Sequence, residues 1–185
     1  ALRSAQSWGM GDFANLRRLA RWSAKKLGAG VVLVNPLNAA SPVIPQQPSP
    51  YFPSSRRYRN LLYLCIEEIP GATELSLDLE RLSAAGRALN REWRIDRDAV
   101  FALKMDALKL LWSHFSGDSR FDDFCEEQGE SLAQFATFCV LAEHHNSGWH
   151  SWPADYRRPD SPAVARFAAH HAEGVRFYQW VQWLL

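Results

Sequence analysis

The sequence predicts an α/β fold with a largely helical second half. Three observations predict it: an amphipathic segment that ends at a glycine, a short apolar run directly after it, and repeated helical patterns beyond residue 71. A helix, a glycine turn and a buried strand in succession make up half of a β–α–β unit. The 185 residues, 47 % of them hydrophobic, are enough for one domain with a sizeable core.

The first predicted helix runs from about Phe13 to Lys26. Asp12 stands where an N-cap side chain would be, leucines and alanines give the segment an apolar face, and Gly28 is placed to end it. The run 31–34, with the sequence Val-Val-Leu-Val, follows between turn signals. Such a run is typical of a buried parallel strand.

Residues 35–61 show neither a helical nor a strand period. Six of the ten prolines lie in this stretch, and proline fixes φ and removes a backbone donor, so we expect an ordered extended loop. Tyr51, Phe52 and Tyr58 distinguish it from a polar linker and indicate a loop packed against other parts of the protein. The segment 62–66, Leu-Tyr-Leu-Cys-Ile, then predicts a second strand.

Beyond residue 71 the apolar residues recur at helical spacing. The last of these stripes reaches the final residue without a glycine, proline or basic last turn, so we expect the parent chain to continue past it. The expected helices begin near Leu75, at Asp96 or Asp98, around Phe121–Phe124, at a capping box Ser131–Gln134, and at Ser161–Pro162, the last continuing to Leu185.

Composition excludes several classes of function. The net charge of +1 gives no field that would attract nucleic acid or an anionic membrane, and no apolar run reaches the roughly 18 residues of a membrane span. The three cysteines form no CxxC pair, and their odd number suits a reducing compartment. We therefore expect a cytoplasmic protein without nucleic-acid or membrane partners.

Several local patterns have both a chemical and an ordinary interpretation, and the ordinary one is favoured for each. Gly9-Met10-Gly11 could be a dinucleotide loop or a tight turn, and the six histidines could be metal ligands or ordinary surface and core residues. The cluster Arg56, Arg57 and Arg59 could be a nucleic-acid site or a solvated loop face. The pairs Glu67-Glu68 and Glu126-Glu127 could be catalytic acids or surface charge. The eight tryptophans favour core packing, although their flat faces also suit sugar rings.

Several stretches together carry a family resemblance. They are Ser7–Phe13 with its Gly-x-Gly-Asp motif, Leu33–Leu37, the Ser-Pro-Tyr loop Ser49–Tyr51 with Ser54–Tyr58, the run Asn60–Leu64, and Trp149 with Trp152-Pro153 and Phe177–Trp183. They resemble 4-α-glucanotransferases, also called amylomaltases or disproportionating enzymes, and the Ser-Ser-Arg-Arg loop resembles actinobacterial members most. The match covers nearly the whole chain.

The resemblance implies a (β/α)8 barrel with helical insertions, whose active site lies at the C-terminal ends of the strands. For this chain it implies a partial TIM barrel. Residues 1–70 would form the first βα units with the substrate loop 35–61, and residues 71–185 a helical insertion subdomain that leads back to the barrel. Ser49 and Tyr51 would line the donor side of the glucan cleft, Tyr51 stacking on a sugar ring and Ser49 hydrogen-bonding it. A core anchor for the loop is the alternative role of Tyr51.

The resemblance also implies retaining transfer of glucan segments between maltooligosaccharides or other α-1,4-glucans, without cofactor or metal. The two aspartates and the glutamate of this reaction would lie in strands beyond Leu185, so no residue here is a catalytic candidate. We therefore expect an inactive fragment whose partner is the rest of the parent chain.

Two rival functions stay open: a stand-alone carbohydrate-binding module and a helical protein-interaction adaptor. If the resemblance holds, two or three barrel strands cannot close a barrel. The exposed strand edges then predict an isolated chain that is poorly soluble or self-associates.

Overall fold

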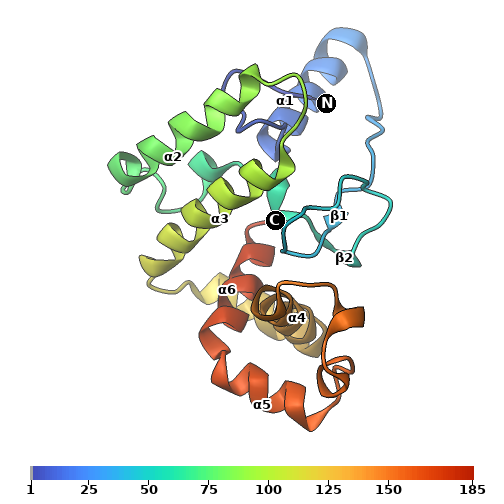
Figure 1. The fold of residues 1–185 in the computed structure, drawn as a ribbon. Coiled ribbons are helices and arrows are strands. Elements are labelled where there is room, and N and C mark those ends of the chain that lie inside the picture. The colour runs from blue at the N-terminus through green and yellow to red at the C-terminus, as the bar shows by residue number, and fades with distance from the viewer. Residues whose placement is uncertain (1) are drawn as a thin grey trace. The chain divides into compact units, whose positions relative to one another are not determined.

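A computed structural model describes residues 2–185, which form two compact units (Figure 1). The first unit comprises residues 2–37 and Asn60–Phe115, and the second comprises Asn38–Arg59 and Ser116–Leu185. Most of the loop predicted to contact substrate, Asn38–Arg59, therefore belongs to the same unit as the C-terminal helices. The expected division at residue 70 between barrel and insertion stays a prediction.

The first helix, α1 (Phe13–Leu27), is confirmed together with both of its caps. The Asp12 carboxylate accepts from the Asn15 N–H at 2.9 Å, and the Asn15 side chain accepts from the Asp12 N–H at 3.3 Å. Gly28 ends the helix with φ of 66°, a left-handed conformation that glycine adopts without strain. Asp12 is thus structural, as the sequence indicates.

The predicted strand at 31–34 is wrong for this structure. The segment is irregular, and Val31 and Leu33 expose 83 % and 94 % of their side chains. A strand exists only where a neighbouring strand exchanges backbone hydrogen bonds with it. Among the described residues, the single sheet pairs only β1 (Asn38–Ala39) with β2 (Ser55–Arg59), so this apolar run has no such neighbour.

The predicted strand at 62–66 is also wrong, because its backbone groups have other partners. The segment forms two short 3₁₀ turns, Leu61–Tyr63 and Ile66–Glu68. The Lys104 ammonium donates to the carbonyl oxygens of Leu62 and Leu64 at 2.7 and 2.6 Å. These bonds use the acceptors that a sheet ladder would need, while the side chains of the turns still pack into the core.

Lys104 lies on α3 (Arg97–Ser113), which packs side by side with α2 (Ser76–Ala88) (Figure 1). Both helices are confirmed, and Asp96 caps α3 by accepting from the Ala99 N–H. Only 1 % of Lys104 is exposed, and burial lowers the pKa of its ammonium to about 8. Burial and nearby carboxylates raise the pKa of the half-buried Cys65 thiol to about 12.

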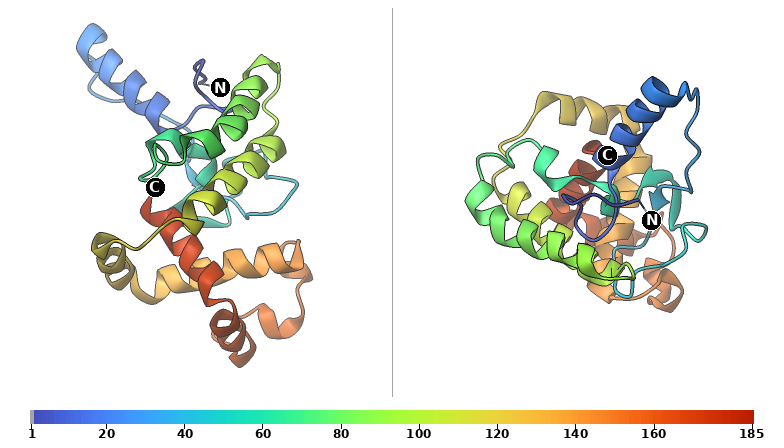
Figure 2. Two further views of the ribbon diagram at one scale, coloured as in Figure 1. Left: turned by 90° about the vertical axis from the view of Figure 1, so that its left-hand side faces the viewer. Right: turned by 90° about the horizontal axis from the view of Figure 1, so that it is seen from above.

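The second unit consists of the β1–β2 ribbon and three longer helices. The strands are antiparallel, with Asn38 opposite Arg59 and Ala39 opposite Ser55. Helix α6 (Ala172–Trp183) packs across α4 (Ser119–His145), as the side view in Figure 2 shows. Helix α5 (Pro162–His170) precedes α6, and short 3₁₀ turns at Trp149–Ser151 and Ala154–Tyr156 link α4 to α5.

The expected break between two helices is confirmed as a kink at Gly129, inside α4, where the φ of 58° is non-helical. Two other helix predictions need correction in this unit. The expected capping box does not form, because Ser131 Oγ accepts a hydrogen bond from the Tyr58 hydroxyl and Gln134 donates to Glu130. The expected single helix 162–185 is divided at His171 into α5 and α6.

The described chain is therefore mostly helical with one small antiparallel ribbon, rather than an α/β unit with two parallel strands. No helix among residues 2–185 combines the length and the apolar character that crossing a bilayer requires.

Candidate functional site

The turn Ser49–Phe52 presents both residues predicted to bind substrate. Pro50 fixes φ at the second position of the turn, and the Phe52 N–H donates to the Ser49 carbonyl at 3.4 Å. The Tyr51 N–H donates to Ser49 Oγ at 3.3 Å, which leaves the Ser49 hydroxyl hydrogen to be donated elsewhere. The turn thus places Ser49 and Tyr51 next to each other.

Tyr51 exposes 64 % of its side chain, so it is not an anchor in the core. Gln46 has the anchoring role instead: it is buried, and its side-chain amide donates to the carbonyls of Ser41 and Val43 at 3.2 and 2.8 Å. At the base of the loop, the Ser54 N–H donates to the Ala39 carbonyl at 2.8 Å. These contacts order the loop, and most of the Tyr51 side chain is exposed.

Tyr58 is the loop aromatic that enters the core. It is buried, its hydroxyl donates to Ser131 Oγ at 3.0 Å, and its ring stacks on Phe135 with centroids 4.3 Å apart. On the other side, Gln182 of α6 pairs with the Arg59 backbone in both directions, at 3.0 and 2.9 Å. Strand β2 is thereby fixed between α4 and α6.

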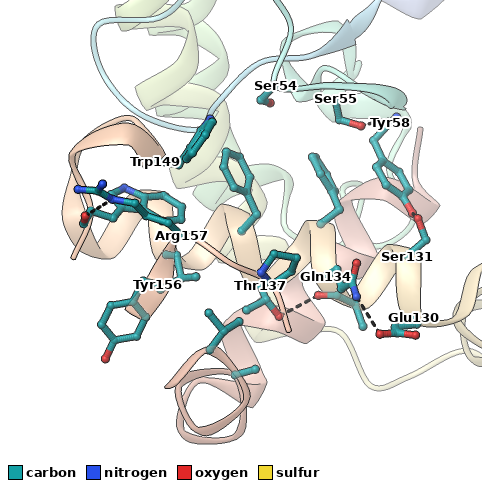
Figure 3. A pocket seen from close by; sticks show the side chains of 18 of the residues that line it. Ser54, Ser55, Tyr58, Glu130, Ser131, Gln134, Thr137, Trp149, Tyr156 and Arg157 are labelled. Atoms are coloured by element: carbon teal, nitrogen blue, oxygen red, sulfur yellow. Dashed lines mark hydrogen bonds between the residues drawn. The ribbon is translucent and has the colours of Figure 1, made fainter. Parts of the chain in front are cut away.

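A cavity of about 620 Å³ opens beside this strand, entirely within the second unit (Figure 3). Its floor is one face of α4, where residues three or four apart share a side. Its size suits a small ligand. The walls come from β2, from the 3₁₀ turns after α4, and from α5, and the lining includes Ser54, Ser55, Tyr58, Gln134, Phe135, Phe138, Trp149, Trp152, Tyr156 and Arg157.

The aromatic wall of the cavity is built on Trp152. Its indole is buried and donates to the Ser147 carbonyl at 3.0 Å, while its ring packs against Phe138 and His145 with centroids 5.4 and 5.6 Å away. Burial and the neighbouring His144 lower the pKa of His145. An electrically neutral, aromatic wall of this kind suits an uncharged ligand.

Comparison with known proteins places this architecture in a family. The sequence profile of a family described as 4-alpha-glucanotransferase matches residues 1–185. The chain is 42 % identical over 197 residues to a 4-alpha-glucanotransferase of Mycobacterium tuberculosis, covering 100 % of this chain and 27 % of the relative. This chain belongs to the 4-alpha-glucanotransferase family.

Other members of the 4-alpha-glucanotransferase family agree with this assignment. A relative from Haemophilus influenzae is 32 % identical over 100 % of this chain and 30 % of its own length. The crystal structure of amylomaltase from Corynebacterium glutamicum superposes with a TM-score of 0.78 at 33 % identity, covering 99 % of this chain and 25 % of that one. The chain therefore spans between a quarter and a third of the length of these relatives.

Trp8 and the pair Glu67-Glu68 have structural contacts in this family member. Trp8 is buried and its indole donates to Glu67 at 2.8 Å, while the Arg17 guanidinium binds both oxygens of Glu68 at 2.5 and 2.7 Å. Among residues 2–185, no three His, Cys, Asp or Glu side chains gather as a metal site would require. The Arg57 guanidinium contacts Gln128.

The sequence predicts the turn Ser49–Phe52 but not the cavity. In the sequence, Trp149 and Trp152 belong only to the family resemblance, and no local pattern marks Phe135 and Phe138 as residues of a cavity. The spacing of Gln134, Phe138 and Leu141 is a usable signal for a common helix face. The contributions of β2 and of the 3₁₀ turns to the same cavity follow from tertiary contacts that no local pattern shows.

Proposed function

We propose that this chain is the glucan-holding part of a 4-α-glucanotransferase that transfers α-1,4-glucan segments between maltooligosaccharides. The observation that carries the proposal is the exposed Tyr51 on an ordered turn, in a chain whose full length matches this family. The family match over the whole chain favours this function over a helical adaptor.

In this proposal Tyr51 offers its ring face to a sugar near the scissile bond. A phenol ring is rigid and amphipathic, so it contributes contact area at a small entropic cost. Ser49 supplies a hydroxyl whose oxygen already accepts from the Tyr51 N–H, so its hydrogen is directed to a sugar oxygen. Holding the donor glucan in one orientation lowers the entropic part of the barrier.

The proposed chemistry is retaining glycosyl transfer. One carboxylate attacks the anomeric carbon as the glycosidic bond breaks, and a carboxylic acid protonates the departing glucan. A hydroxyl of a second glucan then displaces the enzyme carboxylate, and its proton passes to the carboxylate that acted as acid in the first step. We assign these acids to the rest of the enzyme, since the adjacent pair Glu67 and Glu68 is already engaged by Trp8 and Arg17. The chain alone is then inactive.

Further parts of the proposal concern the setting of this reaction. We place residues 1–70 with the first units of the barrel and residues 71–185 in a helical insertion, in a cytoplasmic enzyme. The partner is the remainder of the enzyme, and no organic cofactor takes part.

Replacing Tyr51 with alanine tests the proposal in the complete enzyme. Tyr51→Ala is expected to lower kcat/KM for disproportionation of maltotriose roughly 10- to 100-fold, because the ring face that orients the donor is lost. Tyr51→Phe keeps that face and should retain most of the activity. Glucose release from maltotriose measures both variants.

Phe52 provides the matched control, as a neighbouring aromatic residue that is also exposed on the turn. Phe52→Ala should change kcat/KM far less than Tyr51→Ala, and neither should alter the unfolding midpoint by more than a degree or two. Equal losses in the two variants, or wild-type activity in Tyr51→Ala, would show that Tyr51 does not orient the donor.

A further inference from the structure

We propose that the cavity beside β2 is an additional glucan subsite, in which a sugar ring stacks on Trp149. This inference rests on the proposed function, because it assigns a second section of the same glucan to the unit that carries the turn Ser49–Phe52. The subsite is supported by its proximity to the turn, by its aromatic lining and by the hydrogen-bonding groups that remain available in the cavity.

Proximity follows from the chain itself. Pro53 and Ser54 line the cavity, and Pro53 is only two residues after Tyr51. Two residues span at most about 7 Å even when fully extended. A glucan that contacts Tyr51 therefore needs few further sugar units to reach the mouth of the cavity.

Trp149 supplies the aromatic surface that a sugar ring requires. Its indole lines the cavity and remains 45 % exposed, whereas the other tryptophan of the lining, Trp152, is buried. The Trp149 ring stacks on His150 with centroids 3.8 Å apart, which fixes its orientation. A flat, fixed and partly exposed indole suits the apolar C–H face of a sugar.

Polar groups at the two ends of the cavity suit the hydroxyls of a sugar. Figure 3 shows Trp149 and Arg157 at one end and Ser55 and Tyr58 at the other. The Arg157 Nε donates to the Trp152 carbonyl at 2.7 Å, which positions the guanidinium and leaves its terminal amino groups to donate. Ser55 Oγ accepts from the Arg57 and Tyr58 N–H groups at 3.2 and 3.4 Å, so its hydrogen is left to donate.

The charges of the lining favour a neutral ligand. One guanidinium, Arg157, and one carboxylate, Glu130, line the cavity, so neither sign dominates. An anionic ligand would gain from Arg157 but would be repelled by Glu130. An uncharged polyhydroxylated chain uses both groups, one as donor and the other as acceptor.

The test compares a short and a long glucan on the complete enzyme, with its catalytic carboxylates replaced so that no glucan is turned over. We expect maltoheptaose to bind at least about tenfold more tightly than maltose by calorimetry, because only the long chain reaches both the turn and the cavity. Trp149→Ala should remove most of this length advantage while maltose binding stays unchanged. Trp149→Tyr should restore part of it, since a smaller ring face remains.

Trp93→Ala is the matched control, because Trp93 is 89 % exposed in the first unit. It should keep the length advantage, and circular dichroism should show that all variants remain folded. A length advantage that persists in Trp149→Ala, or no binding of maltoheptaose to the folded enzyme, would overturn the subsite. The maltotriose assay of Tyr51→Ala decides the proposed function separately, so the two failures can be told apart.

Discussion

Replacing Lys104 with alanine is expected to lower the free energy of unfolding of this chain by roughly 3–5 kcal/mol. The substitution leaves the Leu62 and Leu64 carbonyls without their buried donor, and each unpaired buried group costs about 1–3 kcal/mol. It also leaves a cavity at a position that is 1 % exposed. These costs outweigh the relief from no longer burying a charge. Urea unfolding followed by far-UV circular dichroism measures the change.

Two further variants separate the contributions at this site. Lys104→Met fills the space but cannot donate a hydrogen bond, so it should lower the free energy of unfolding less than Lys104→Ala does. It should still lower it more than the control Lys109→Ala, on the exposed face of α3. If Lys104→Ala destabilises the chain no more than Lys109→Ala, the hydrogen bonds from Lys104 to the Leu62 and Leu64 carbonyls do not stabilise the fold.

The pH dependence gives an independent readout of the same group. The pKa of Lys104 is lowered to about 8 in the folded chain, below the 10.5 of an exposed lysine. Between these values the unfolded chain binds more protons than the folded one, so the Lys104 contribution to stability rises with pH and is lost again as pH falls to 8. The stability gap between wild type and Lys104→Met should therefore widen from pH 8 to 10 by at most roughly 3 kcal/mol.

How far the sequence predicts this fold depends on whether local or distant groups determine an element. Asp12, Gly28 and Asp96 act within a few residues of the helices they cap, and those helices are where the sequence places them. The run 62–66 has the composition of a strand, yet its carbonyls are bound by Lys104, about 40 residues away. No window around 62–66 contains that lysine, so its effect cannot be predicted locally.

The candidate site likewise has a part that local residues determine and a part that distant residues determine. The turn Ser49–Phe52 follows from its own residues, since proline and serine favour those turn positions. The local sequence does not determine which aromatic residue of the loop is buried. Tyr51 and Tyr58 have the same side chain, and of the two Tyr58 is the one that contacts Ser131 and Phe135. The sequence thus predicts the exposed part of the site better than the cavity, which three separate segments build.

The second large effect is expected at a close packing contact in the first unit, between Gly86 of α2 and Trp8. A Cβ added at Gly86 would lie 2.5 Å from two atoms of the Trp8 ring, and that ring is buried and held by its bond to Glu67. Gly86→Ala should therefore lower the free energy of unfolding by about 1–3 kcal/mol through overpacking. At a helix position with no close neighbour, a glycine-to-alanine change would instead raise the free energy of unfolding by up to about 1 kcal/mol.

A double-mutant cycle with Trp8→Leu assigns this cost to the contact itself. A leucine is smaller than an indole and can move away from position 86, so Gly86→Ala should cost little, or stabilise the chain, once Trp8 has been replaced. The coupling between the two substitutions is then expected to exceed about 1 kcal/mol in urea unfolding. If Gly86→Ala destabilises the chain equally in both backgrounds, the two residues are not in contact, and the sequence Ser7–Phe13 is not held against α2 in this way. A strong coupling would instead explain why a glycine stands in the middle of a helix, where its backbone freedom is otherwise a disadvantage.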